Sequence, residues 1–97
     1  MKGVNVVRYV LNLNKTGNAY YCDCNEAIDS DGNKRLLHNE VGFSFLLING
    51  KIRLLGGWHI GTEDFEFGEN EYWVLEHYHP GITEQVVNKA KEMEVEA

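Results

Sequence analysis

Proline, cysteine and cationic residues are all scarce in this sequence. Its 97 residues include one proline and two cysteines, and a single proline excludes a proline-rich linker or stalk. Lys and Arg number 9 against 15 Asp and Glu, which leaves a formal net charge of -6. We expect no direct binding to nucleic acid or to an anionic membrane surface, because both depend on an excess of Lys and Arg.

Long apolar runs are also lacking. No unbroken run is longer than that at residues 45–48, which is far short of the roughly 18 residues that cross a bilayer. Polar residues interrupt the N-terminal segment where a secretory signal would stand. Cys22 and Cys24 are two positions apart, so in a strand they would share a face, with a Cα separation near the upper limit for a disulfide. We therefore expect reduced thiols and a cytoplasmic protein.

The apolar pattern predicts a small α+β domain covering residues 1–97. Apolar residues make up 43% of the chain, and in several segments they alternate or run together as in β-strands. We expect strands at residues 4–13, 19–23, 41–48, 51–58, 62–67 and 72–79, with a short helix as the alternative for the last segment. The expected fold is an antiparallel sheet of about five to six strands with one C-terminal amphipathic helix packed on it.

Local signals support these elements. Asn49-Gly50 is the strongest, because both central positions of a type I′ hairpin turn need positive φ. Residues 15–18 and Asp31-Gly32 predict further turns. Gly56-Gly57 predicts a bulge or a strand end, and the shifted alternation after Val6 predicts a bulge or a strand buried on both faces. Thr83 is the expected N-cap of the final helix, whose apolar stripe comprises Val86, Val87, Ala90 and Met93.

Negative charge is concentrated in the C-terminal half. Residues 1–53 carry seven cations and five acids, whereas residues 54–97 carry two cations and ten acids. Within residues 63–76 there are six acids and no cation, interleaved with aromatic residues. The candidate partner-binding residues in this segment are Glu63, Asp64, Glu66, Glu69, Glu71, Tyr72, Trp73 and Glu76.

This acidic segment has two interpretations. Acids spaced along an edge, with Tyr72 and Trp73 as anchors, can imitate a row of phosphates and attract a protein whose groove is basic. Trp and Tyr are also frequent hot-spot residues at interfaces. The alternative is an ordinary solvated strand face whose aromatic residues, such as Phe65 and Phe67, point into the core.

The sequence contains two candidate metal sites, although we expect no bound cofactor. The zinc alternative uses Cys22, Cys24, His77 and His79, because thiolate and imidazole both suit a tetrahedral zinc ion. The C-x-C spacing differs from the usual C-x2-C knuckle, and the site would need two strands adjacent and in register. The interpretation without metal is two buried thiols and two imidazoles at the rim.

The second metal candidate is a twelve-residue stretch that resembles a calcium loop. Asp29, Asp31, Asn33 and Glu40 occupy the ligand positions 1, 3, 5 and 12. Lys34 stands where such a loop needs glycine, and we expect no amphipathic helix on either side. A simple Asp-Gly turn loop is the alternative.

A small-ligand pocket is a further candidate. Trp58, His59 and Tyr21 are the residues we assign to it, because the preceding glycines let a backbone approach a large π face. A nucleotide or other aromatic ligand would suit it, at a dimer seam. The alternative is that Trp58 is a core residue at the end of a strand.

The leading hypothesis is a non-catalytic acidic module that binds a basic protein. It would act as an inhibitor or nucleic-acid mimic, with a nucleic-acid-binding protein as one class of partner. In size and charge the chain resembles small acidic proteins that phages make against host machinery. A homodimer is also an expected arrangement, because a chain this short buries a modest core. The alternatives are a small-ligand or metal-binding protein and, third, a small hydrolase that uses His77 or His79 as its base.

Overall fold

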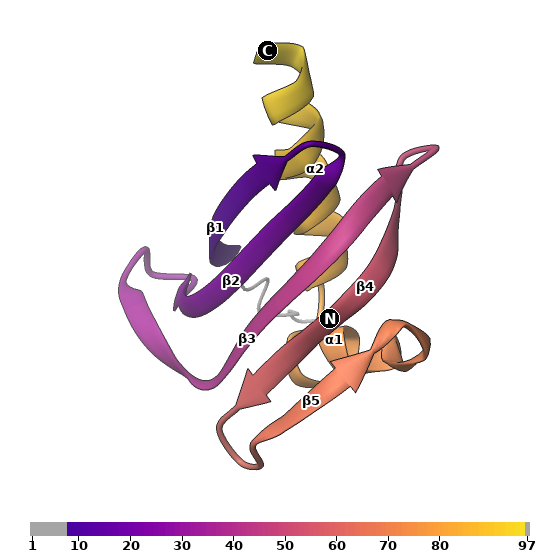
Figure 1. Ribbon diagram of the computed structural model, residues 1–97. Helices are drawn as coiled ribbons and strands as arrows, with labels where there is room; N and C mark the ends of the chain where they lie inside the picture. The colour runs from indigo at the N-terminus through magenta and orange to yellow at the C-terminus, as the bar shows by residue number, and fades with distance from the viewer. Residues whose placement is uncertain (1–7, 97) are drawn as a thin grey trace, which may run out of the picture.

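The computed structural model describes residues 8–96, which form one antiparallel sheet and three helical segments. The strands follow one another across the sheet in chain order, as a meander (Figure 1). They are β1 (Arg8–Thr16), β2 (Ala19–Ile28), β3 (Lys34–Ile48), β4 (Lys51–Ile60) and β5 (Phe65–Gly68). The part of the first predicted strand before residue 8, with the shift after Val6, lies outside the described residues.

The turn between β3 and β4 is the best-defined local feature. Asn49 has a φ of 54° and Gly50 a φ of 77°, so the predicted type I′ turn is confirmed. Ile48 and Lys51 flank this turn and pair with each other. In a two-residue hairpin this flanking pair exchanges both of its backbone hydrogen bonds, which fixes the register of the two strands.

Bulges make the strands longer than the alternation predicts. Along β4, Leu54 pairs with Phe45 and Gly56 pairs with Ser44, so Leu55 is an extra residue in the ladder. The bulge predicted around the two glycines is therefore confirmed, and the strand continues through it. Similar shifts occur within β1 and within the β2–β3 pair. Because a bulge breaks the alternation of faces, β2 and β3 extend beyond their predicted bounds.

The prediction of a sixth strand at residues 72–79 is wrong. This segment follows η1 (Glu69–Glu71) and forms α1 (Trp73–Tyr78). Val74 and Leu75 are adjacent and both fully buried. Adjacent residues point to opposite faces of a strand, but they can share the buried side of a helix. The favoured strand assignment is thus replaced by its helical alternative.

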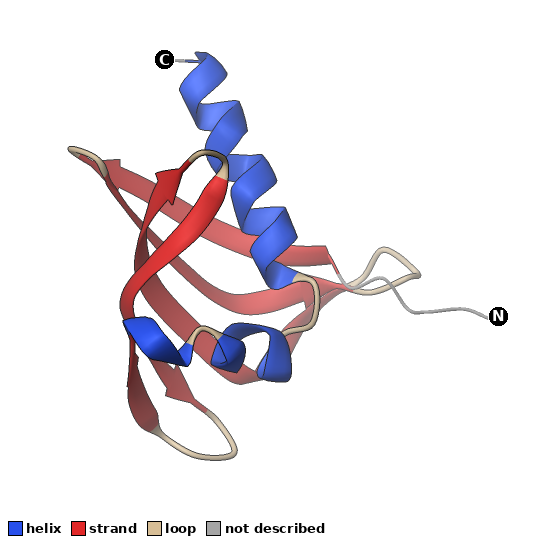
Figure 2. Ribbon diagram, turned by 90° about the vertical axis from the view of Figure 1, so that its right-hand side faces the viewer, coloured by secondary structure: helices blue, strands red, loops and turns tan. Residues whose placement is uncertain are grey.

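The C-terminal helix is present as predicted. α2 (Ile82–Glu96) buries Ile82, Val86 and Ala90 completely. It starts at Ile82, one residue before the predicted N-cap Thr83. α1 and α2 lie on the same side of the curved sheet (Figure 2).

The core lies between the sheet and the helices. Its largest fully buried side chains include Tyr20, Phe43 and Phe45 from the sheet and Leu75 and Ile82 from the helices. The tyrosine ring stacks on that of Phe45 with centroids 5.1 Å apart. A five-stranded antiparallel sheet with a C-terminal helix packed on it is the predicted α+β fold. Within residues 8–96 no helix combines the length and the apolar character needed to cross a membrane.

Candidate functional site

The candidate partner-binding residues occupy one continuous stretch of the fold. Glu63 and Asp64 lie in the turn between β4 and β5, and Glu66 lies on β5 opposite Trp58. The remaining candidates follow in η1, in α1 and at Tyr72 between them, in the segment that continues from β5 (Figure 1). We call the exposed part of this stretch, residues 63–76, the acidic surface.

Three of the six acids have local structural roles. The Asp64 side chain accepts a hydrogen bond from the Gly61 amide at 3.1 Å. The Glu71 side chain accepts one from the Gly68 amide at 2.9 Å, where η1 begins. Substituting these acids would therefore disturb a turn and a helix start as well as the charge.

Glu76 holds the start of α2. Its carboxylate accepts hydrogen bonds from the Gly81 amide at 2.9 Å, the Thr83 amide at 3.0 Å and the Thr83 hydroxyl at 2.6 Å. Partial burial raises the pKa of Glu76, but these hydrogen bonds outweigh it and hold the pKa below its ordinary value. The carboxylate thus satisfies free amides at the first turn of the helix, the role predicted for the Thr83 side chain.

The other three acids are free to act on a partner. Glu63, Glu66 and Glu69 are exposed, and within the described residues their carboxylates make no hydrogen bond or ion pair. Their charges therefore project into solvent, where they attract cations over about one Debye length.

The aromatic residues of the segment divide between the core and the surface. Phe67 is buried and Phe65 packs against the core, as in the solvated-strand interpretation. Trp73 is 58% exposed and Tyr72 is 39% exposed, as the interface interpretation requires. The Trp73 ring contacts only the edge of His77 among the described aromatic rings, at a centroid distance of 5.8 Å.

Two hollows lie beside Tyr72. One of about 570 Å³ separates the β3–β4 turn from α2 and includes Ile52, Val87 and Lys91 in its lining. The other, of about 340 Å³, lies between β4 and η1. Sequence analysis missed both hollows, because they depend on where β5 ends and where the helices cross the sheet.

The four residues of the zinc hypothesis do not come together. Cys22 and Cys24 are free and buried in the core, His79 is buried, and His77 is exposed on α1. No group of three potential metal ligands occurs among the described residues. Burial raises the pKa of the thiols to about 12 for Cys22 and about 11 for Cys24, which keeps both protonated and unreactive.

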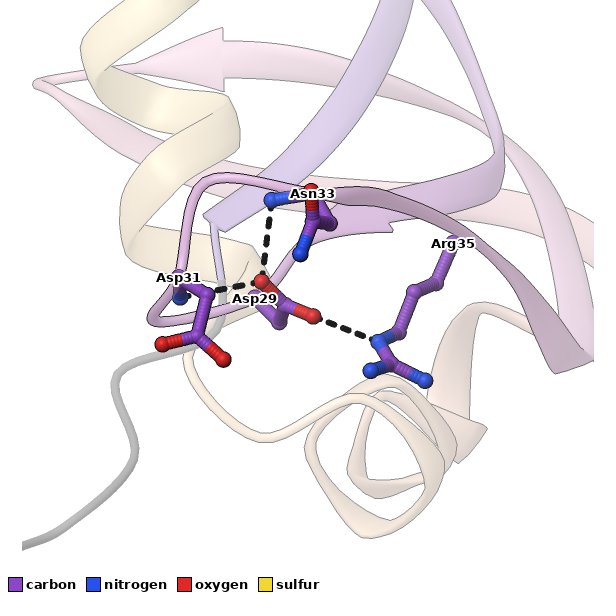
Figure 3. A network of polar contacts seen from close by, with 4 residues as sticks. All are labelled: Asp29, Asp31, Asn33 and Arg35. Atoms are coloured by element: carbon purple, nitrogen blue, oxygen red, sulfur yellow. Dashed lines mark hydrogen bonds and ion pairs between the residues drawn. The ribbon is translucent and has the colours of Figure 1, made fainter.

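The calcium-like stretch forms a turn held by one carboxylate. Asp29 accepts hydrogen bonds from the amides of Asp31 at 3.0 Å and Asn33 at 2.9 Å, and Arg35 forms an ion pair with it (Figure 3). Glu40 lies well along β3, opposite Ile60. The ligand positions are therefore spread over a turn and a strand instead of surrounding one point.

Two of the three predicted ligand-binding residues meet on the sheet face away from the helices. The Trp58 indole N–H donates a hydrogen bond to the Tyr21 hydroxyl at 3.0 Å. The indole lies over Gly42, because a Cβ at that glycine would come within 2.4 Å of indole carbons. His59 points the other way and is buried, so it cannot join them.

His59 and His79 are buried polar groups that the sequence did not reveal. Both Nε2 atoms are buried and have no hydrogen-bond partner in the described part of the chain. His59 Nδ1 lies 2.6 Å from the Glu63 carbonyl oxygen, to which it donates as the Nδ1–H tautomer. Burial, and then the nearby His59, lower the pKa of His79 from 6.5 to about 4. The His79 imidazole is therefore a neutral part of the core at pH 7.

No protein-family model, curated protein or solved structure matches this chain. Its function is therefore argued from the surface and its chemistry alone.

Proposed function

We propose that this protein is a non-catalytic binding module that docks on a basic protein through the acidic surface. The observation that carries this proposal is the exposure of Trp73, 58%, and Tyr72, 39%, next to exposed carboxylates. Large aromatic side chains bury more area per residue than any others, so leaving two of them in solvent costs free energy that a partner would recover.

The distribution of charge supports a basic partner. Glu66 and Glu69 are exposed and unpaired within the described residues, and they lie within β5 and at the start of η1, respectively. Unpaired carboxylates beside aromatic anchors favour cationic groups and repel acidic ones. An inhibitor that covers the nucleic-acid groove of its partner would have this combination, with carboxylates in the places of phosphates.

The environment of the catalytic candidates supports a non-catalytic role. The Glu76 carboxylate is engaged by three hydrogen bonds at the start of α2. His79 is buried and His77 is exposed, and within the described residues no hydrogen bond joins either imidazole to the Glu76 carboxylate. A general base needs a hydrogen-bonded path to its substrate, and this arrangement offers none at His79.

The test is capture of a partner from lysate at low ionic strength with matched variants. The double variant Glu66→Lys/Glu69→Lys reverses the two acids that have no local role. We expect it to lower the association rate of the captured partner about tenfold, since charge acts mainly on association. Glu92→Lys makes the same kind of change on α2, outside the acidic surface, and should leave most of the rate intact.

A second variant tests the anchors. Trp73→Ala should raise the dissociation rate about tenfold or more if the indole is buried in the complex, because hot-spot truncation acts mainly on dissociation. A partner that binds both variants with wild-type rates, or whose association is unchanged between low and high salt, would contradict the proposal.

A second candidate function is supported by the Tyr21–Trp58 contact. The hydrogen bond of 3.0 Å holds two rings together on the sheet face away from the helices, as a surface on which a planar ligand could stack. Titration with adenosine, followed by the NMR signal of the Trp58 indole N–H, tests it. A shift that saturates, and is absent in Tyr21→Leu, would support a ligand site over a protein interface.

A further inference from the structure

Half of one strand edge in the sheet has no neighbour. β5 pairs with β4 only over the four residues from Gly56 to His59. The preceding residues 51–54 of β4 pair with β3 on one side, and no strand of the described chain pairs with their other side. Figure 1 shows β5 beside only the lower part of β4, while the part near the β3–β4 turn has no strand to its right.

The register identifies the unpaired backbone groups. Ile48 and Lys51 flank a two-residue turn and so form a hydrogen-bonded pair. In an antiparallel ladder such pairs alternate with pairs whose backbone groups point outward. The N–H and C=O groups of Ile52 and Leu54 therefore point away from β3. No hydrogen bond from the described residues reaches them.

The open edge lies at the base of a groove. Ile52 and Leu54 line the hollow of about 340 Å³, together with Glu69 and Asn70 of η1. Ile52 and Tyr72 also line the larger hollow, on the side of α2. Residues 51–55 span about 17 Å when extended, which is the length of a short β-strand. The space beside them is therefore bounded by side chains on both flanks.

Charge is unevenly distributed along this groove. Near the β3–β4 turn are two cations, Lys51 and Lys91, and one acid, Glu84; the Lys91 ammonium group would lie 3.5 Å from a Cβ at Gly50. At the other end, where β5 stops, are Glu69 and one cation, Arg53. Because Arg53 alternates with the buried residues Ile52 and Leu54, its side chain projects to the other face of β4. A ligand lying along the core side of the edge would therefore meet an excess of cations at one end and Glu69 at the other.

We infer that this open edge binds an extended segment of a partner protein as an additional antiparallel strand. The segment carries a cation near Glu69 and an acid near Lys51 and Lys91. Its backbone forms hydrogen bonds with the unpaired N–H and C=O groups of Ile52 and Leu54. Its two central side chains that point toward the core are apolar, and they fill the space beside Tyr72. Antiparallel pairing continues the direction of β5 and is the more stable arrangement. The inference goes beyond the proposed function, because it depends on backbone groups and on the basic end of the groove.

A second copy of the chain fits the edge less well. Suppose that Ile52 of each copy formed backbone hydrogen bonds with Leu54 of the other. The two copies would then be related by a two-fold axis through Arg53. That arrangement places two Arg53 side chains directly opposite each other, and like charges at such positions are destabilising. A partner segment with complementary charges avoids this contact.

The test is NMR amide exchange with a synthetic peptide probe, acetylated Lys-Val-Thr-Val-Glu amide. In the free protein the amides of Ile52 and Leu54 should exchange quickly, although both lie inside a strand, while Arg53 is protected by β3. Saturating peptide should slow Ile52 and Leu54 at least about tenfold and leave Arg53 unchanged. The peptide Glu-Val-Thr-Val-Lys, with its charges exchanged, should bind several-fold more weakly.

Matched variants separate this inference from the proposed function. Lys91→Glu should weaken binding of the probe about fivefold, while Lys89→Glu, which is exposed on the same helix outside both hollows, should not. Both substitutions lie outside the acidic surface. If the inference is wrong and the proposed function is right, both variants should therefore still capture the basic partner. Protection of Ile52 and Leu54 in the free monomer, protection that rises with protein concentration, or no response to millimolar peptide would each overturn the inference.

Discussion

The two outer edges of the sheet are closed in different ways. At β1, the Tyr9 amide donates a hydrogen bond to the Gln85 side chain at 2.9 Å, and the Tyr9 hydroxyl donates to the Pro80 carbonyl at 2.8 Å. The start of α2 is thus tied directly to that edge. At β4, the chain provides β5 for one half of the edge and no strand for the other.

The remaining part of β1 is protected by its side chains. Thr16 and Ala19 flank a two-residue turn with positive φ at Gly17, so Leu13 and Lys15 direct their backbone groups outward. Lys15 projects to the core side, with its ammonium group 5.3 Å from the centre of the Tyr20 ring. An inward-facing lysine and a bulge are devices that discourage pairing along an edge. An unpaired edge is therefore a binding site only where its flanks make room for a strand, as beside β4.

The largest predicted effect concerns the boundary between the paired and unpaired halves of β4. A Cβ at Gly57 would lie 2.5 Å from the Gly42 carbonyl oxygen and 2.5 Å from the Phe67 ring. We expect Gly57→Ala to lower the free energy of unfolding by about 3–4 kcal/mol, because backbone and a buried ring must both move. Urea denaturation followed by circular dichroism measures this loss.

Gly56 supplies the matched control for that substitution. A Cβ there would meet only the Phe67 carbonyl oxygen at 3.5 Å, an ordinary contact. Gly56→Ala should therefore change stability by less than about 1 kcal/mol. Equal losses of stability in the two variants would show that β5 does not pack against β4 as described. The boundary between the paired and unpaired halves of β4 would then lie elsewhere.

The next effect is a pH dependence at the closed edge. The His79 ring contacts the Tyr9 ring edge-to-face at a centroid distance of 5.7 Å, so it lies beneath the tied end of β1. The pKa of His79 is lowered from 6.5 to about 4 by burial and then by His59. The unfolded chain therefore binds this proton more readily than the folded chain does. The free energy of unfolding should fall by about 3 kcal/mol as pH drops from 6.5 towards 4.

Two histidine variants test the origin of that pH dependence. His79→Gln should flatten the decline in stability between pH 6.5 and 4, because the buried titrating group is gone. His77 is exposed on α1, and His77→Gln should leave the decline unchanged. An identical pH profile in wild type and His79→Gln would assign the effect to another group.

Local patterns were enough to predict most of the fold. Asn49-Gly50 specifies its turn through the φ values of two residues, and the apolar stripe specifies α2, so neither depends on distant contacts. Residues 72–79 were assigned incorrectly because aromatic and β-branched residues favour strands in isolation. Tertiary packing of Val74 and Leu75 on the core decides that segment, and a single sequence does not contain this information.

The candidate site was predictable in composition and not in geometry. The run of acids identifies the acidic surface, and the exposure of Trp73 follows from where α1 lies on the sheet. The role of Glu76 at the start of α2 joins residues seven apart across a turn. β4 has an open edge because the chain leaves the sheet at Gly68. No motif in the sequence predicts that β5 ends there.

A smaller effect is expected from removing the bond that ties β1 to α2. Gln85→Ala leaves the Tyr9 amide without its acceptor at a partly buried position. We expect a loss of about 1 kcal/mol and faster exchange of the Tyr9 amide. Unchanged exchange at Tyr9 would mean that another group covers this end of the edge. The chemical shifts of Ile52 and Leu54 should not change, because they belong to the opposite side of the sheet.

The smallest change in stability is expected at Lys15, where the consequence is association. Lys15→Val removes an inward-facing charge from the edge strand β1 and its contact with the Tyr20 ring, and should alter stability by less than about 1 kcal/mol. Two β1 edges could then pair without burying ammonium groups, so light scattering should show self-association. Lys89→Val, the same change at an exposed position of α2 away from any strand edge, should stay monomeric to the same degree as wild type. If Lys15→Val does too, the bulge and the Gln85 contact suffice to protect β1, and the lysine is not what distinguishes the two edges.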